Sequence, residues 1–489
     1  MKPVSNAPVS STADVLNLDI LEQYDIDIAR VYITADGRYL VNEPSITDEA
    51  VRLYVSVVSR INLSLDIETD LDPQTLAGRF TEAFWEVAER MKRIEDARRL
   101  FPKLDYYIRR NLAGYGLLDV PMRDPDIEDI LCSAPARPIR VVHKRYSGRF
   151  NTLVTNVAFP GDADMQGYIQ RIFGKTGSEP TEAKPMSVTH MADGSRISVT
   201  FADQISKPGS VIAIRRFPER PFTMPDMIRS GTLTAPMAAY LWTLLDAKAV
   251  GLVIGVTGSG KTTFLSSLVS MMNPRWRILT IEDTLELRIP HGDWVRLNTR
   301  KSYGVSEERF DVTVRNLIDI SLTQRPDYEI VGETRLYDMD ALFQSVGTGH
   351  GGLTSFHAST PQGALARLRG NDIGDGELGL LWFVVHTANV RRLDRYHRKV
   401  SGIFEITADD TGHVKIHDIY RYDIFADAFC GAGPESSRRY AEALEICGIS
   451  DADADMKRRI ALLDDCVRQD VSDPHEVFQI LGRYYDDSA

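Results

Sequence analysis

The run GLVIGVTGSGKTT, residues 251–263, joins four apolar residues to a complete match of the pattern GxxxxGK[ST]. Residues 251–254 predict a buried strand, and the helix-forming run from Phe264 predicts a helix, so the glycine-rich turn has the context of a phosphate-binding loop. Glycines let backbone N–H groups turn toward phosphates, and the helix N-terminus adds positive potential. The alternative, a glycine-rich turn with a coincidental lysine, is disfavoured by that context.

The loop also predicts the ligands of a nucleotide's phosphates and of a metal ion. Lys261 would reach the β- and γ-phosphates, and the Thr262 hydroxyl would hold Mg²⁺. The residues expected to contact the phosphates are Gly255, Thr257, Gly258, Ser259, Gly260, Lys261, Thr262 and Thr263.

Three further loops follow predicted strands. The strand 277–281 is followed by the carboxylates Glu282, Asp283 and Glu286, at the end of a strand where open α/β sheets place ligand-handling groups. A glutamate there could orient an attacking water or bind Mg²⁺ through a water, whereas the alternative is a solvated acidic turn.

The strand 328–331 ends at Gly332-Glu333, which alone is a weak Walker B match, because the common pattern has an Asp directly after the apolar residues. The fourth loop has His350 and His357 around a short strand. A lone histidine is more often a packing or surface group than a sensor, but four such loops on one predicted sheet favour a functional role.

Together the four stretches resemble, in order, the Walker A, Asp, Walker B and His boxes of the type II/type IV secretion ATPase superfamily. They read GVTGSGKTT (255–263), ILTIEDTLEL (278–287), RPDYEIVGETR (325–335) and TGHGGLTSFHA (348–358). The interposed glycine and the glutamate of the third stretch are typical of this family. The segments 112–135, 191–199 and 210–228 are similar to the N-terminal domain and linker of its archaeal branch, which includes archaellum motors and archaeal type IV pilus-assembly ATPases.

This resemblance implies a role for individual residues. Lys261 and Thr262 match the Walker A pair, Glu286 the water-activating Asp-box position, Glu333 the Walker B carboxylate, and His357 the γ-phosphate sensor. Thr262 and Glu333 would hold Mg²⁺, and the nucleotide would be ATP.

The resemblance also implies a contribution from upstream arginines. Arg196 matches an N-domain arginine that reaches a nucleotide, that of a neighbouring subunit, with Arg215 and Arg216 beside it on the linker side. The alternative is that all three are ordinary surface or ion-paired arginines.

The expected fold class is α/β, with a C-terminal RecA-like P-loop ATPase domain and a mixed α/β N-terminal domain. We expect one long surface helix over 77–100. The expected segments are a disordered tail (1–15), an N-terminal α/β region (16–99), an N-terminal domain that contributes to the nucleotide cleft (100–217), a proline-rich linker (218–226), the RecA-like domain (227–430) and a C-terminal helical tail (431–489).

The composition of the 489-residue chain limits its partners. Its net charge of −12 disfavours nucleic acid, and its four cysteines contain no CxxC pair that would suggest a zinc cluster. No apolar run approaches the ~20 residues that span a bilayer, so contact with a membrane is expected to be peripheral.

The resemblance implies a homo-hexameric ATPase motor at the cytoplasmic face of the cell membrane. Its partner would be a polytopic platform protein, and its work the assembly or rotation of a type IV pilus-like filament, or protein secretion. Two alternatives remain: a RecA-like nucleic-acid translocase, and a nucleotide-dependent scaffold with little turnover.

Overall fold

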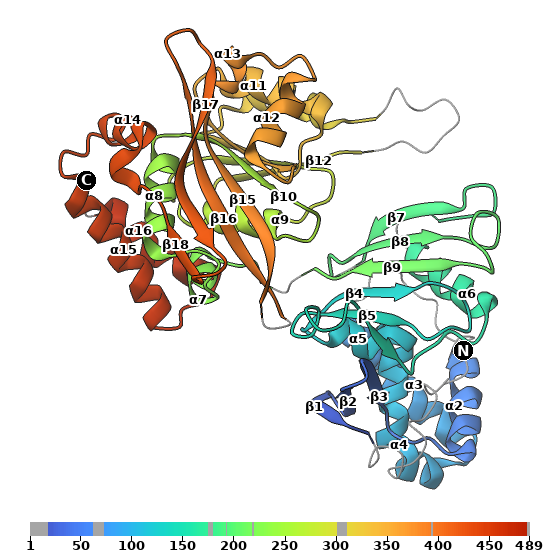
Figure 1. Cartoon of the computed structure of the whole chain (residues 1–489). Helices are drawn as coiled ribbons and strands as arrows, with labels where there is room; N and C mark the ends of the chain where they lie inside the picture. Colours follow the sequence, from blue (N-terminus) through green and yellow to red (C-terminus); the bar gives the residue numbers. More distant parts are fainter. Residues whose placement is uncertain are drawn as a thin grey trace. The chain divides into compact units, whose positions relative to one another are not determined.

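The computed structural model describes residues 18–61, 73–174, 179–191, 193–217, 220–300, 311–392 and 395–486. It divides into two compact units, Met1–Pro218 and Glu219–Ala489, each with its own sheet (Figure 1). The tail expected over 1–15 lies outside the described residues. In the described part of the chain, no helix is both long enough and apolar enough to cross a membrane.

In the first unit, the described residues form one mixed sheet of nine strands. The only parallel pair among its described strands joins β3 to β6, and this pair connects the regions expected as 16–99 and 100–217 into one sheet with one core. In sheet order the strands are β1 (Ile20–Ile26), β2 (Ala29–Thr34), β3 (Arg38–Asn42), β6 (Leu153–Thr155), β5 (Arg140–His143), β4 (Ile127–Cys132), β9 (Val211–Arg215), β8 (Arg196–Thr200) and β7 (Met186–His190).

The helices of this unit correct one expectation. The single helix expected over 77–100 is wrong, because α3 (Pro73–Arg90) ends and α4 (Ile94–Ile108) begins within that range. Lys92 has a left-handed φ of +53°, and the Arg93 N–H donates a hydrogen bond to the Ala88 carbonyl oxygen. This is the C-terminal capping pattern that stops a helix. The resulting hairpin lets Phe84 of α3 and Phe101 of α4 pack together, with ring centroids 5.3 Å apart. The other helices of this unit include α2 (Asp48–Ile61), α5 (Asp119–Arg123) and α6 (Asp162–Phe173).

The second unit contains a parallel sheet extended by antiparallel strands. Strands β12, β11, β13, β14, β10 and β15 are parallel, and β16, β17 and β18 then add on antiparallel. In sheet order they are β12 (Trp294–Asn298), β11 (Ile278–Glu282), β13 (Tyr328–Val331), β14 (Gly351–His357), β10 (Val250–Gly255), β15 (Leu381–Arg392), β16 (Arg395–Ala408), β17 (Val414–Asp423) and β18 (Ala428–Cys430). The predicted fold class is confirmed.

Helices cover both faces of this sheet (Figure 1). Successive side chains of β10 point to opposite faces of the sheet. Val253 packs in one apolar core, and Leu252 and Ile254 pack in the other. The helices on the Val253 side are α7 (Met224–Arg229), α8 (Ala235–Asp246), α9 (Lys261–Val269), α14 (Arg438–Ile446), α15 (Ala452–Arg468) and α16 (Pro474–Asp486). The opposite face packs against α10 (Val314–Ser321), α11 (Met339–Val346), α12 (Pro361–Arg369) and α13 (Asp375–Leu378).

Two expected segments look different in this unit. Helix α7 begins at Met224, inside the stretch 218–226 expected as a linker, because Thr223 and Asp226 form a capping box. The stretch expected as a C-terminal tail supplies buried Leu463, Val477 and Leu481 to the core around α8, so it is an integral part of the unit.

Candidate nucleotide-binding site

The phosphate-binding loop connects β10 to α9, as the sequence predicts. Gly258 and Gly260 have φ of +77° and +89°, a left-handed conformation that side chains disfavour. A Cβ on Gly255 would lie 2.5 Å from the Thr387 carbonyl oxygen, so only glycine fits there. The loop therefore forms a backbone-lined cradle, and Gly260 is the N-cap of α9.

Three of the predicted site residues form a chain of polar contacts. Lys261 Nζ lies 3.2 Å from His357 Nδ1, and His357 Nε2 lies 3.2 Å from Glu333 Oε1. Because an ammonium group can only donate, Nδ1 accepts and Nε2 carries the proton that faces Glu333. Burial lowers the pKa of Lys261, and the charges of Glu333 and Glu286 oppose this shift. Four residues from four separate boxes thus act on one another.

Sheet topology explains this convergence. Strands β11, β13, β14 and β10 are neighbours and run parallel, so their carboxyl ends lie along one edge. Each of the four boxes follows or ends one of these strands. Between them, Arg335 Nη2 lies 3.2 Å from Asp283 Oδ2, which ties the loop after β13 to the loop after β11. This edge is where α/β folds bind their ligands.

Glu282, the first carboxylate of the acidic run, was given no individual role by the sequence. It is 2% exposed, and its Oε1 accepts hydrogen bonds of 2.8 Å from the backbone N–H groups of Glu286 and Leu287. Its Oε2 is buried and has no hydrogen-bond partner among the described residues. Burial raises the pKa of Glu282 to about 7. This carboxyl group fixes the turn that presents Glu286, and no local sequence signal distinguishes it from Asp283, which lies next to it on the surface.

These residues fit a magnesium–nucleotide complex. The glycine cradle leaves room for phosphate oxygens, and carboxylate and hydroxyl oxygens are the ligands Mg²⁺ prefers. Thr262 at the start of α9 and Glu333 after β13 are the candidate metal ligands.

The three arginines carried over from the resemblance belong to the first unit. Arg196 on β8 and Arg215 on β9 are register partners, so both exposed side chains project from the same side of the sheet. Arg215 Nε lies 3.2 Å from Asp129 Oδ1. Arg216, in contrast, donates a hydrogen bond to the Asp124 carbonyl. The structure places Arg196 beside Arg215, and it engages both Arg215 and Arg216 with groups of their own unit.

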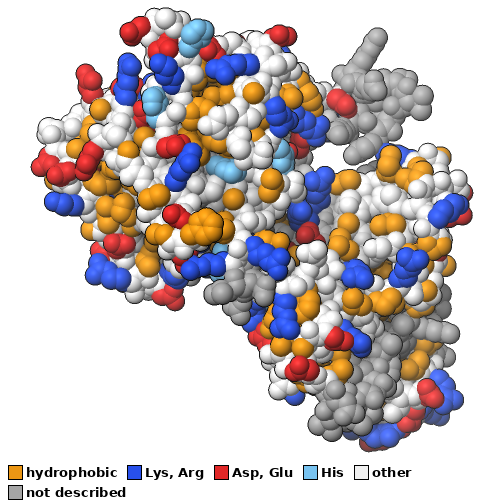
Figure 2. Space-filling view, in the orientation of Figure 1, with side chains coloured by type: hydrophobic (Ala, Val, Ile, Leu, Met, Phe, Trp, Pro, Cys, Tyr) orange, Lys and Arg blue, Asp and Glu red, His pale blue; other side chains and the backbone are white. Residues whose placement is uncertain are grey.

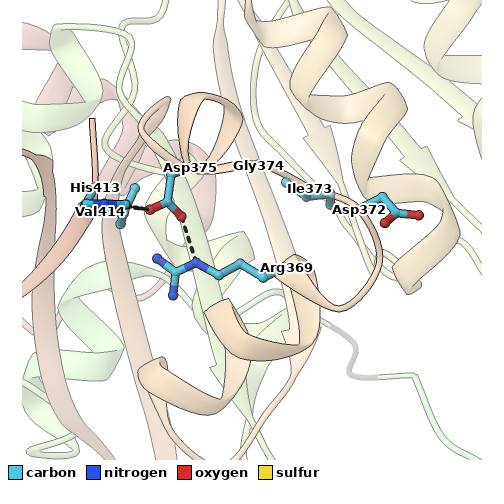
Figure 3. A pocket seen from close by; sticks show the side chains of 7 residues that line it. All are labelled: Arg369, Asp372, Ile373, Gly374, Asp375, His413 and Val414. Atoms are coloured by element: carbon cyan, nitrogen blue, oxygen red, sulfur yellow. Dashed lines mark hydrogen bonds and ion pairs between the residues drawn. The ribbon is translucent and has the colours of Figure 1, made fainter. Parts of the chain in front are cut away.

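One hollow in the second unit is lined by none of these residues. It measures about 680 Å³ and lies beside α12, the start of α13 and the β16–β17 turn (Figure 3). There Asp375 accepts hydrogen bonds from Arg369 Nε at 2.7 Å and from the Val414 N–H at 3.2 Å. Arg369 is the main reason that the pKa of Asp375 falls to about 2. The carboxylate joins the turn to the helices, which is a structural role.

A second buried carboxyl group, Glu329, lies at the amino end of the same strand that leads to Glu333. It is 0% exposed, and accepts hydrogen bonds from Ser345 at 2.6 Å and Ser321 at 3.1 Å. His350 Nε2 lies 3.9 Å away, so the first histidine of the fourth box belongs to this cluster and not to the phosphate site. Burial raises the pKa of Glu329 to about 7.

This shift predicts a pH-dependent component of stability. The pKa of Glu329 is higher in the folded protein than in the unfolded chain, so between the two values the native state keeps a proton that the unfolded chain releases. The free energy of unfolding therefore falls as pH rises from about 4.5 to about 7. We expect Glu329→Gln to remove about 3 kcal/mol of this fall, measured by urea unfolding between pH 4.5 and 8. Glu445→Gln, at an exposed position, is the control. If the free energy of unfolding depended on pH equally in both variants, the prediction would be contradicted.

With this geometry established, comparison with known proteins identifies the family. The family model described as Type II/IV secretion system protein matches residues 156–400, and the chain belongs to this family. An uncharacterized protein of Methanocaldococcus jannaschii is 29% identical over 404 residues, which cover 78% of this chain and 70% of that protein. A putative conjugal transfer protein of Mycobacterium tuberculosis is 32% identical over 270 residues, covering 53% and 74%.

Among solved structures, the ATPase DotB of Legionella pneumophila aligns with a TM-score of 0.44 and 14% identity, covering 75% of this chain and 94% of that one.

Proposed function

We propose that the chain hydrolyses ATP with Mg²⁺ and works as a hexameric motor that drives assembly or rotation of a type IV pilus-like filament, or protein secretion. The observation that carries the ATPase part is the polar chain from Lys261 through His357 to Glu333 at the edge that holds the phosphate loop. The hexamer, a polytopic membrane platform as partner and a peripheral position at the inner face of the cell membrane rest on the family resemblance.

In this proposal each residue has a distinct task. The backbone of the loop and Lys261 bind the phosphates, and Thr262 and Glu333 hold the metal, which neutralises phosphate charge when bound. Glu286, on the turn fixed by Glu282, orients the attacking water and accepts its proton. His357, placed between Lys261 and Glu333, responds to the γ-phosphate. Arg196 and Arg215 would act on the nucleotide of a neighbouring subunit.

The experiment is a measurement of ATP hydrolysis per protomer against protein concentration, with Mg²⁺ at low salt. Because the sites of such a motor are shared between subunits, we expect the rate per protomer to rise with concentration, and the Glu286→Gln variant to lose it. Glu445→Gln makes the same chemical change on the exposed surface of α14 and should keep the wild-type rate. A flat background rate in the wild type would contradict the motor and favour a nucleotide-dependent scaffold.

The nucleic-acid translocase is the second candidate. On the face shown in Figure 2, basic and acidic side chains are interspersed over the second unit, and the chain carries a net charge of −12. Neither feature favours binding to a phosphate backbone. Hydrolysis that single-stranded DNA stimulates, with a steep dependence on salt, would support the translocase instead.

A further inference from the structure

The hairpin of β15 and β16 extends beyond the carboxyl edge of the parallel sheet. β15 pairs with β10 as far as His386, which lies opposite Ile254, and then continues to Arg392. β10 itself ends at Gly255, where the phosphate loop begins. The overhanging part of the hairpin therefore lies beside that loop (Figure 1).

One face of this overhang contacts the phosphate loop. Asn389 Nδ2 donates a hydrogen bond of 3.3 Å to the Gly258 carbonyl oxygen. Arg398 Cδ lies 3.5 Å from the point that a Cβ on Gly260 would occupy. Asn389 and Arg398 are register partners on β15 and β16, so their side chains project from the same side of the hairpin. We call this side the inner face.

The opposite face has a structural role. Lys399 Nζ donates a hydrogen bond of 2.6 Å to the Gly231 carbonyl oxygen, and Arg392 pairs with Asp427 in the β17–β18 turn. The cations of this face thus hold the hairpin to its own unit. They fix the position of the inner face relative to the loop.

We propose that Arg398 is a phosphate-binding residue of the nucleotide site in the same protomer, and that Asn389 holds the loop in place for it. The inference rests on the proposed binding of ATP. A guanidinium group forms paired, charge-assisted hydrogen bonds with phosphate oxygens, and the Arg398 stem already lies against the glycine that precedes Lys261. In a chain with a net charge of −12, a cation at this position also offsets the repulsion of a polyphosphate.

The hairpin supplies a matched control. Arg391 is the register partner of Tyr396 and lies on the same face of the hairpin as Arg398. It is two residues further along the strand than Asn389, so it lies about 7 Å further from the loop. Arg391→Gln removes the same charge as Arg398→Gln at nearly the same place. The comparison separates a direct contact from a long-range effect of charge.

The test is calorimetric titration of the full-length wild type and its variants with Mg-ATP and Mg-ADP. We expect Arg398→Gln to weaken both affinities about tenfold or more, Arg391→Gln to change them less than about threefold, and Arg398→Lys, which keeps the charge without the planar fork, to lie between. Unchanged affinity in Arg398→Gln, or equal losses in the two Gln variants, would overturn the inference.

The design also separates this inference from the proposed function. If the wild type binds Mg-ATP and Lys261→Ala does not, ATP binding holds, and a normal affinity of Arg398→Gln then defeats the role of Arg398 alone. If the wild type binds no Mg-ATP, the proposed function fails, and this inference with it. Thermal unfolding of each variant checks its fold, and Arg398→Lys carries the test if Arg398→Gln is unfolded.

Discussion

Replacing Lys261 by alanine should lower ATP turnover by at least about 10²- to 10³-fold, the loss typical when a preorganised charge-stabilising donor is removed from an active site. Lys261 is 7% exposed, and its Nζ lies 3.2 Å from His357 Nδ1. The negative charges of Glu333 and Glu286 also interact with its ammonium group. Its removal takes away the cation that balances these carboxylates as well as the phosphates. Steady-state phosphate release with Mg²⁺ measures the effect.

Lys248 provides the control for this experiment. It precedes β10 at the amino end, opposite the phosphate loop, and its Nζ lies 2.8 Å from Asp327 Oδ1. Lys248→Ala removes the same charge from the same unit and should keep turnover within about twofold, because a partly exposed ion pair contributes little. Equal losses in both variants would show that lost stability, and not lost catalysis, explains the effect of Lys261→Ala.

The second large effect concerns stability. Arg459 of α15 is buried, with its side chain 1% exposed, and it pairs with Asp246 Oδ2 at 2.6 Å and Asp455 Oδ2 at 2.8 Å. Its guanidinium carbon also lies 4.1 Å from the centre of the Tyr484 ring of α16. One side chain thus joins α8, α15 and α16. We expect Arg459→Met to lower the free energy of unfolding by about 3–5 kcal/mol, because it leaves buried carboxylates without a counter-charge.

The pH dependence of this loss tests its cause. Burial raises the pKa of Asp246 even with Arg459 present. Without the arginine, the carboxyl groups can avoid the cost of an unpaired charge by taking up protons, so the difference between wild type and variant should be smaller at pH 5 than at pH 8. Four of the five tryptophans lie in the second unit, so tryptophan fluorescence in urea follows its unfolding.

Arg468 is the matched residue on the same helix. Its side chain is 72% exposed and pairs with Asp465, a surface contact worth at most about 1 kcal/mol. Arg468→Met should therefore unfold nearly as the wild type does. A loss below about 1 kcal/mol in Arg459→Met as well would show that the buried ion pairs do not hold the C-terminal helices in place.

The sequence predicted the elements that carry a contiguous signal. The phosphate loop needs glycines at fixed spacing between a strand and a helix, and this pattern is local, so residues 251–263 predict both the fold class and the cradle. The same holds for Glu286, Glu333 and His357, each of which lies at or shortly after the end of a predicted strand. Parallel strands place such residues at one edge of a sheet, so their proximity follows from the pattern.

The sequence did not predict the end of α3, because the left-handed position there is Lys92 and not the glycine that usually marks such a cap. It also gave Glu282 and Asp283 equal weight. Only burial separates them, since Glu282 turns into the protein and Asp283 faces solvent. Packing at the strand end decides which of these two adjacent side chains points into the protein.

What the sequence by itself determined about this protein is its family and its α/β class, and it predicted the site residues that lie in the four boxes, because these depend on short patterns and their order. The tertiary structure decided which distant residues meet. Arg398 lies against Gly260, and Arg459 pairs with Asp246, across separations of more than 100 residues in the chain. Such contacts depend on sheet register and on helix packing, which no local pattern encodes.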